Sequence, residues 1–327
     1  MISAEKAIEF LQQGKVVAVP TETVYGLAAD ALNPAAIAKV FEIKNRPADN
    51  PLICHFYSEE QIRSYVKEIP VTTQKLMNAF SPGPISFMLD LPENSPLKFA
   101  ACGNAQVIAR IPDHPVFLDL IKKFNHPVAA PSANTSGKVS PTSAGMVQKD
   151  LGEKVDGIVD GGASKVGLES TIVDARSEKE ILILRHGFIG EKEIHSVSPQ
   201  AKIIDEKTFQ HGTTPGSKYR HYAPDTPIFE AKDFLSVKHE RRIAMLLTQQ
   251  QFNSISELDR EKFILQENHL IILGSINDLN ELARNFYLYL ASVDHLKISK
   301  AYLLKNDWGK SSLGKALQQR IEKIVAR

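Results

Sequence analysis

Short apolar runs alternate with longer amphipathic stretches along most of the chain. Apolar runs of four to eight residues between turn-forming residues are typical of buried strands, and apolar residues at helical spacing are typical of surface helices. In the first 190 residues this pattern predicts strands at 16–19, 52–55, 85–89, 107–111, 128–130, 169–174 and 181–184. It predicts helices between Ser3 and Gly14 and at 33–41, 58–67, 71–80 and 115–124. These elements indicate an α/β domain.

A polar stretch with glycine and proline, from about 190 to 224, interrupts the pattern, which then resumes. Strands at 243–247, 268–273 and 299–304 alternate there with helices at 277–296 and 311–326. This order predicts a small parallel α/β domain of Rossmann-like type. The chain has 327 residues, more than one typical domain. We therefore expect a catalytic domain at 1–195, a linker at 196–224 and a C-terminal domain at 225–327.

The composition of the chain excludes several classes of protein and site but does not by itself assign a function. Hydrophobic residues make up 43% and charged residues 24% of the chain, which is typical of a soluble globular protein. The formal net charge of +1 gives no overall attraction to nucleic acid. Cys54 and Cys102 form no CxxC pair, so we expect reduced thiols and no zinc site. The N-terminus lacks a signal-peptide pattern and no run of about 18 apolar residues occurs, so we expect a cytoplasmic protein.

The segment 42–55 carries the first candidate chemistry, because a single residue separates Lys44 from Arg46. Pro47 and Pro51 bias the residues before them away from helix, which predicts a stiff, extended segment. Alternate side chains of an extended chain share one face, so both cations are expected to point the same way. Two cations on one face suit a polyanion such as a triphosphate or a nucleic acid backbone. A solvated pair on a loop is the alternative.

Polar loops at the ends of predicted strands carry further candidates. Thr21, Thr23 and Tyr25 follow the first strand, where α/β sheets place ligand-binding loops, although a capping turn has the same composition. The run Ser132-Ala-Asn134 follows another strand and supplies groups that suit phosphate, although many loops share its composition. Arg110 lies on an apolar strand and therefore needs a carboxylate or a ligand. The chain has no Walker A or GxGxxG stretch.

Taken together, five ordered motifs resemble those of one family. They are Pro20-Thr-Glu-Thr-Val-Tyr-Gly26, Lys44-Asn-Arg46-Pro, Asn50-Pro-Leu-Ile-Cys-His55, Ser132-Ala-Asn134 and Glu169-Ser-Thr-Ile-Val173. The set is similar to the threonylcarbamoyl-AMP synthases with a YrdC-type domain, and the C-terminal domain resembles the long form of that family. This resemblance implies a twisted mixed sheet with helices in the first domain. The chain lacks acylphosphatase-like and zinc-finger segments, so the related carbamoyltransferases of hydrogenase maturation fit poorly.

The resemblance implies that L-threonine, bicarbonate and ATP give threonylcarbamoyl-AMP and pyrophosphate, with Mg²⁺ held mostly by the phosphates. The implied partners are a downstream threonylcarbamoyl-transfer complex and, weakly, tRNA, with no membrane. By motif, the implied catalytic residues are Lys44 and Arg46, and the implied threonine contacts are Thr23, His55, Arg110 and Ser170. The implied ATP contacts are Lys44, Arg46, Asn50, Ser132, Asn134, Arg185 and Tyr222. Gln106 joins the ATP contacts through its spacing to Arg110 alone.

Two other functions are compatible with these residue types. An RNA-binding module would use Lys44, Arg46, Arg110 and Lys138 as a basic cleft, and its binding would weaken with salt. A regulatory domain would bind ATP and threonine without turning them over. Release of pyrophosphate that depends on threonine distinguishes a synthase from both.

The linker contains a dense run at 213–224 with two tyrosines, a histidine, a lysine and an arginine. A passive linker rarely has this composition, and Pro215 and Pro224 limit its freedom. We expect the run to close over bound ATP as a lid, with Tyr222 at the nucleotide. A linker packed on the domain surface for stability is the alternative. Lys218 and His221 receive no role.

Overall fold

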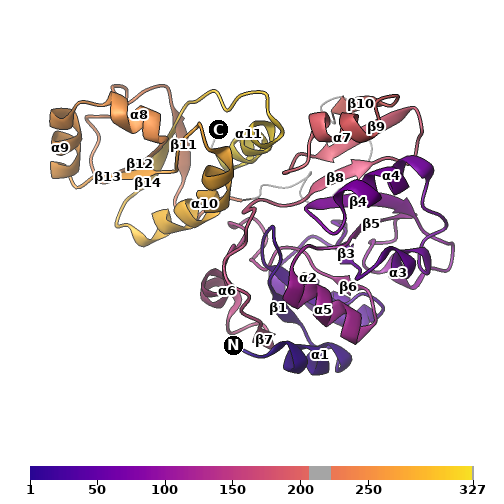
Figure 1. Cartoon of the computed structure of the whole chain (residues 1–327). Coiled ribbons are helices and arrows are strands. Elements are labelled where there is room, and N and C mark those ends of the chain that lie inside the picture. Colours follow the sequence, from indigo (N-terminus) through magenta and orange to yellow (C-terminus); the bar gives the residue numbers. More distant parts are fainter. Residues whose placement is uncertain (206–221, 326–327) are drawn as a thin grey trace. The chain divides into compact units, whose positions relative to one another are not determined.

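The computed structural model describes residues 1–205 and 222–325, which form two compact units (Figure 1). The first unit contains the described residues up to Asp205 except Gly137–Val139. That short segment clusters with the described residues from Tyr222 onward, which make the second unit. Each unit has its own sheet. Within the described residues, no helix is both long enough and apolar enough to cross a membrane.

A ten-stranded mixed sheet runs through the first unit, which confirms the predicted fold class. The strand order is β10-β9-β8-β4-β5-β3-β6-β2-β1-β7. The strands are β1 Val17–Val19, β2 Gly26–Asp30, β3 Ile53–His55, β4 Ile85–Asp90, β5 Gln106–Arg110, β6 Val128–Ala129, β7 Gly157–Ile158, β8 Thr171–Asp174, β9 Glu180–Arg185 and β10 Lys202–Asp205. β1 and β7, β3 and β5, β4 and β8, and β9 and β10 pair in parallel, and the remaining neighbours are antiparallel.

Helices of the first unit cover both faces of this sheet. They are α1 Ala4–Gln12, α2 Pro34–Lys44, α3 Glu59–Arg63, α4 Val71–Phe80, α5 Pro115–Phe124, α6 Ala144–Leu151 and α7 Glu191–Val197, with a 3-10 turn at Pro96–Lys98. Val17 and Val19 of β1 pack with α1 and α5, whereas Ala18 belongs to the cluster that contains α2. Alternate residues of one strand therefore face opposite layers of helices. The sequence pattern missed α6 and α7 and made α3 too long.

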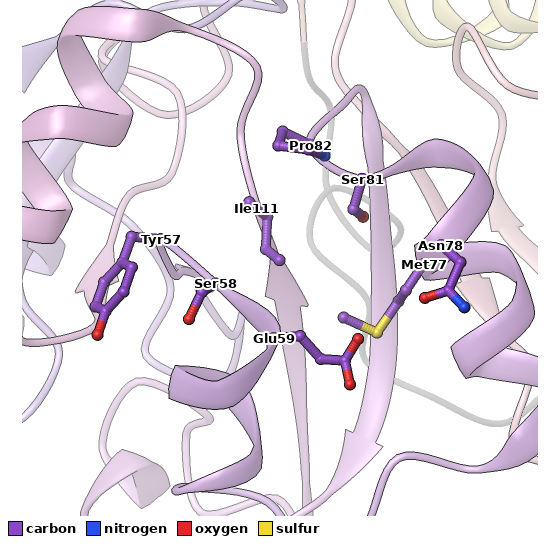
Figure 2. A pocket seen from close by; sticks show the side chains of 8 residues that line it. All are labelled: Tyr57, Ser58, Glu59, Met77, Asn78, Ser81, Pro82 and Ile111. Atoms are coloured by element: carbon purple, nitrogen blue, oxygen red, sulfur yellow. The ribbon is translucent and has the colours of Figure 1, made fainter.

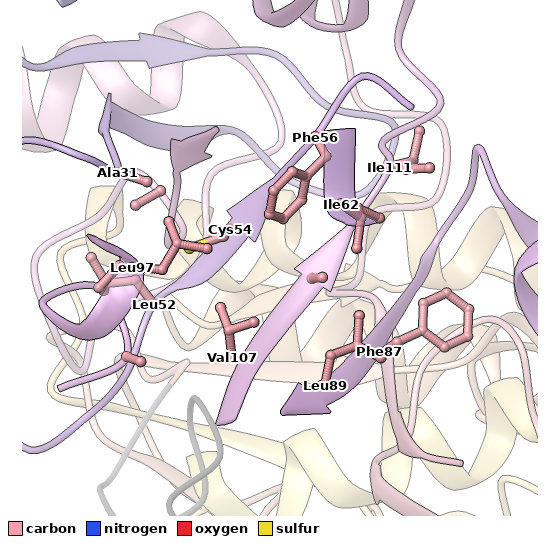
Figure 3. Close-up of a cluster of buried hydrophobic side chains, with 14 of the residues drawn as sticks. Ala31, Leu52, Cys54, Phe56, Ile62, Phe87, Leu89, Leu97, Val107 and Ile111 are labelled. Carbon is pink, nitrogen blue, oxygen red and sulfur yellow. The ribbon is translucent and has the colours of Figure 1, made fainter. Parts of the chain in front are cut away.

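The larger apolar cluster lies between the sheet and helices that include α2, α3 and α4. Figure 3 shows Leu52, Cys54, Phe56, Phe87 and Val107 within it. Each of these residues is at most 1% exposed. Burial of one Phe or Leu side chain contributes about 1.5–3 kcal/mol to stability. The predicted apolar strands thus supply this core and hold in place the strand ends that carry polar residues.

The second unit has a four-stranded parallel sheet of order β11-β14-β12-β13, which confirms the predicted Rossmann-like type. Its strands are β11 Ile228–Ala231, β12 Ile243–Leu247, β13 His269–Ile272 and β14 Lys300–Leu304. Its helices are α8 Gln249–Ser254, α9 Glu257–Leu265, α10 Leu279–Ser292 and α11 Ser312–Ile324, with a 3-10 turn at Val293–His295. The sequence pattern missed β11, α8 and α9.

Regular structure continues into the interval that the composition marks as a linker. α7 buries Ile194 and ends at Val197, and β10 then pairs with β9 at the edge of the large sheet. An edge strand has one paired side and one open side, so it tolerates a polar sequence. Polar composition is therefore a poor guide to where the first unit ends.

Candidate active site

Lys44 is the last residue of α2, and its side chain lies inside the first unit. Only 1% of the residue is exposed, and its Nζ donates hydrogen bonds of 2.5 Å to the carbonyls of Ser132 and Asn134. The KxR and SxN motifs therefore meet at one buried ammonium group. Burial, and next the charge of Arg46, hold the pKa of Lys44 well below its usual value.

The predicted extended conformation of the Lys44–Arg46 segment is wrong. α2 continues to Lys44 and ends because Asn45 adopts a left-handed conformation, with φ 50° and ψ 47°. Asparagine tolerates this conformation better than most residues, and Pro47 opposes continuation of the helix. The two cations therefore contact different loops and do not share one extended face.

Arg46 is held against the loop that follows it. Its Nε donates to the Asn50 carbonyl at 3.0 Å, and its Nη2 donates to the Pro51 carbonyl at 2.9 Å. Asn50 is 4% exposed, and both polar atoms of its side-chain amide are buried without a hydrogen-bond partner among the described residues. A buried amide without partners lowers stability, so this loop is suited to a polar ligand.

Arg110 is the last residue of β5 and has a carboxylate partner, which an arginine on an apolar strand requires. Its Nη2 donates to Glu22 Oε1 at 2.5 Å, its Nη1 to Thr23 Oγ1 at 3.0 Å, and its Nε to the Gly83 carbonyl at 3.2 Å. The side chains of Arg110 and Glu22 are each 4% exposed. Sequence reasoning missed Glu22, although this glutamate stands inside one of the motifs.

His55 ends β3 and is the register partner of Arg110 on β5. The residue is 2% exposed, its ring centroid lies 5.4 Å from that of Phe117, and its Nδ1 has no partner within residues 1–205 and 222–325. Burial first, and the charge of Arg110 second, hold the pKa of His55 well below its usual value. The imidazole is therefore neutral at pH 7 and offers hydrogen bonds without a charge.

Ser170 and Arg185 form a second group, around the start of β8 and the end of β9. Arg185 Nη2 donates to Ser170 Oγ at 3.0 Å, and Arg185 Nε donates to the Ser170 carbonyl at 3.0 Å. The Oγ of Ser86 lies 2.8 Å from the Oγ of Ser170. One predicted threonine contact and one predicted ATP contact thus touch directly.

Both parts of the chain match models of known protein families. A family model described as telomere recombination matches residues 9–187, and one described as threonylcarbamoyl-AMP synthase, C-terminal domain, matches residues 189–324. The threonylcarbamoyl-AMP synthase of Pyrococcus abyssi is 36% identical over 97% of this chain and 92% of its own length. That of Bacillus subtilis is 33% identical over 98% of this chain and 92% of its own length. The chain belongs to the threonylcarbamoyl-AMP synthase family.

This membership confirms the predicted enzyme class, a nucleotidyltransferase that makes threonylcarbamoyl-AMP for tRNA modification. The crystal structure of Pyrococcus abyssi Sua5 complexed with L-threonine matches the synthase described here with a TM-score of 0.84 and 33% identity. The match covers 99% of this chain and 96% of that chain. Escherichia coli YciO, at 19% identity and a TM-score of 0.51 over 58% of this chain, shares the fold alone.

Gln106 lies at the opposite end of β5 from Arg110 in this synthase. Its Nε2 donates to Asp90 Oδ1 at 2.9 Å. Residues four positions apart on a strand are separated by roughly 13 Å. The structure therefore does not bring Gln106 to the strand end that carries Arg110.

Tyr222 belongs to the second unit of the synthase. Its ring stacks on that of Tyr287 at a centroid distance of 5.7 Å, and the Arg320 guanidinium lies 5.6 Å from its centroid. Its φ of 72° is uncommon for a bulky residue. Residues 213–221 of the predicted lid, with Lys218 and His221, lie outside the described residues, so the lid stays a prediction.

The first unit also has a cavity of about 420 Å³ (Figure 2). It is lined by Tyr57, Ser58, Glu59, Met77, Asn78, Ser81, Pro82 and Ile111. The carboxylate of Glu59 is already paired with Arg63. None of the residues predicted from the sequence lines this cavity, although Pro82 and Ile111 adjoin Gly83 and Arg110 in the chain.

The buried state of His55 predicts how stability depends on pH. Below about pH 6.5 the unfolded chain takes up a proton at His55 that the folded chain refuses, so the unfolding free energy should fall as pH drops. Between pH 7.5 and 5.5 we expect a loss of about 1 kcal/mol that His55→Gln does not show. Urea titration measures it, with the exposed His126→Gln as the control. An identical loss in His55→Gln would contradict the prediction.

Proposed function

We propose that the first unit of this synthase joins L-threonine, bicarbonate and MgATP beside Lys44, His55 and Arg110. The observation that carries the proposal is the buried Lys44 ammonium, bonded to the carbonyls of Ser132 and Asn134. These residues stand 88 and 90 positions away in the sequence. A buried cation is costly on its own, and an anionic phosphate beside it offsets that cost.

Threonine is held in this proposal by Arg110, Thr23, His55 and Ser170. After its contacts with Glu22, Thr23 and Gly83, the Arg110 guanidinium retains one N–H on Nη1 and one on Nη2 that no other described residue accepts. Two such groups bind a carboxylate bidentately. The unpartnered Nδ1 of neutral His55 is then available to the threonine hydroxyl.

The nucleotide is held by Arg46, Asn50, Arg185 and the Ser132–Asn134 loop, with Lys44 at the phosphates. The two unpartnered amide atoms of Asn50 support this role, because they are buried at the loop to which Arg46 is bound. The direct contact between Arg185 and Ser170 supports a cation beside the proposed threonine site. Tyr222 and Gln106 stay predicted ATP contacts.

The proposed chemistry has two steps. The threonine amine forms a bond to the carbon of CO₂ derived from bicarbonate and loses a proton, which gives a carbamate. A carbamate oxygen then bonds to the α-phosphorus of ATP, while the bond from that phosphorus to pyrophosphate breaks. Negative charge gathers on the leaving group, so cations and donors placed in advance lower the barrier. Lys44, Arg46 and Arg185 supply these cations.

Magnesium enters this scheme with its substrate as MgATP. Among the described residues, no group of three or more His, Cys, Asp or Glu side chains could hold a metal ion, and Cys54 and Cys102 are free thiols. Because the product serves tRNA modification, we place the reaction in the cytoplasm. A threonylcarbamoyl-transfer complex then takes the product, with weak tRNA contact.

Burial argues against a nucleic acid surface built on the same cations. Lys44 is 1% and Arg110 is 3% exposed, so neither can contact an RNA backbone on the protein surface. Lys138 is half-buried and pairs with Asp225 at 3.1 Å. Two of the four cations that suggested an RNA-binding module are thus used inside the first unit.

We expect pyrophosphate release to require threonine and bicarbonate together, because the carbamate is the nucleophile. The assay combines purified protein, MgATP, threonine and bicarbonate, and omits one component at a time in CO₂-depleted buffer. Omission of either component should return the rate to that of an enzyme-free control. Equal release without threonine would indicate an ATPase. Binding of ATP and threonine without any release would indicate a regulatory protein.

A further inference from the structure

Glu22 has a buried carboxylate of which one oxygen is paired and the other is not. Its Oε1 accepts from Arg110 Nη2 at 2.5 Å, and its Oε2 has no hydrogen-bond partner among the described residues. The residue is 3% exposed. A buried carboxylate oxygen without a hydrogen-bond donor lowers stability. The unpartnered Oε2 beside Arg110 therefore indicates that a bound ligand supplies the donor.

The backbone around Glu22 is fixed by hydrogen bonds. The Glu22 carbonyl accepts from Val166 N at 2.8 Å, and the Thr23 carbonyl accepts from Gly167 N at 3.1 Å. Thr21 Oγ1 accepts from Thr23 N at 3.1 Å and donates to the Val24 carbonyl at 2.7 Å. The side chain of Glu22 therefore extends from a backbone that these hydrogen bonds hold in place.

His114 is a second titratable group near this carboxylate, since the charge of Glu22 acts on its ring. Its Nδ1 is buried without a partner in the described part of the chain. Burial lowers the pKa of His114, and this effect outweighs the opposite effects of the Gly161 backbone and of Glu22. The ring is therefore neutral at pH 7 and supplies no second positive charge to Glu22.

We propose that Oε2 of Glu22 accepts a hydrogen bond from the α-ammonium group of L-threonine. This rests on the proposed function, in which Arg110 binds the threonine carboxylate. Glu22 is bonded to Nη2, so a substrate carboxylate on the same guanidinium lies next to Glu22. The ammonium is attached to the carbon that carries that carboxylate and so faces Oε2. Arg110 and Glu22 together then complement a zwitterion.

In this role, Arg110 and Glu22 together select amino acids over carboxylic acids that lack the amine. (R)-3-Hydroxybutyrate keeps the carboxylate, the hydroxyl and the methyl group of threonine and lacks only the ammonium. Glu22→Gln keeps an oxygen for Arg110 and presents an NH₂ group in place of Oε2. The NH₂ group is a hydrogen-bond donor, so it cannot accept a hydrogen bond from the threonine ammonium. It has no such effect on a ligand that lacks the ammonium.

Isothermal titration of the full chain with both ligands tests the proposal. We expect wild type to bind threonine at least about tenfold more tightly than (R)-3-hydroxybutyrate, since a charge-assisted hydrogen bond has that magnitude. Glu22→Gln should weaken threonine binding by about tenfold or more and change 3-hydroxybutyrate binding by less than about twofold. Glu68→Gln, at an exposed position of the first unit, should change neither.

Three results would overturn the proposal. Equal weakening of both ligands in Glu22→Gln would mean that Glu22 only positions Arg110, and unchanged threonine binding would mean that it faces no substrate. Wild type that binds both ligands within about twofold would also exclude it, whether or not the variant folds. Wild type that binds no threonine would instead contradict the proposed function itself.

Discussion

Replacement of Lys44 by methionine should lower kcat/KM for MgATP by roughly 30- to 150-fold, or about 2–3 kcal/mol. Methionine keeps the apolar stem and removes the ammonium that bonds to the Ser132 and Asn134 carbonyls. The phosphates then lose a buried cation at the moment when pyrophosphate leaves. Steady-state measurement of pyrophosphate release at varied MgATP gives the value.

Lys39→Met is the matched control for this experiment, because Lys39 is exposed on the same helix and donates to the Gly14 carbonyl. Its kinetics should stay close to those of wild type. Near-normal turnover of Lys44→Met would assign Lys44 a structural role, in which it only joins the KxR and SxN motifs. Thermal unfolding of both variants separates lost catalysis from lost folding.

Arg110→Lys should raise KM for threonine by at least roughly thirtyfold, or about 2 kcal/mol, and leave KM for ATP nearly unchanged. Lysine lacks the planar guanidinium, so it cannot keep the contacts with Glu22, Thr23 and Gly83 and also bind a carboxylate bidentately. Saturation curves for each substrate, with the other in excess, measure the two constants.

Arg176→Lys serves as the control, because Arg176 also bonds to carboxylates, those of Asp90 and Asp174, and has no proposed role in the site. It should change neither KM. If Arg110→Lys raises both KM values equally, the substitution has disturbed the strand ends as a whole. If it changes neither, Arg110 does not touch threonine.

The elements that sequence predicted well depend on short-range signals. α5 begins at Pro115 and ends at Phe124, as predicted, because proline starts a helix easily and Asn125 at its end adopts φ 59°. The apolar runs placed the end of β3 at His55, as the structure has it, and the end of β5 one residue beyond Arg110. The motifs indicated the family and the function without any knowledge of these contacts.

The contacts themselves were beyond sequence reasoning, because they join distant residues. Glu22 and Arg110 are 88 positions apart, and no local pattern pairs them. The direction of Lys44 depended on one residue, since a left-handed Asn45 ends α2 after Lys44 and turns the chain. The bias imposed by the prolines predicted an extended chain at Lys44. The helix instead continues to Lys44, because packing of Ile37 and Val40 supports it.

The pairing of β1 with β7 has a consequence for synthesis on the ribosome. β1 lies near the N-terminus, and its parallel neighbour β7 follows about 140 positions later, where Val16 N also donates to Asp156 Oδ2. Until Ile158 has left the exit tunnel, one edge of β1 has no hydrogen-bonding partner strand. Val17 and Val19 then lack some of the apolar residues that bury them. Exposed strand edges promote association between chains, so this interval is the stage of synthesis at which β1 offers an unpaired edge to other chains.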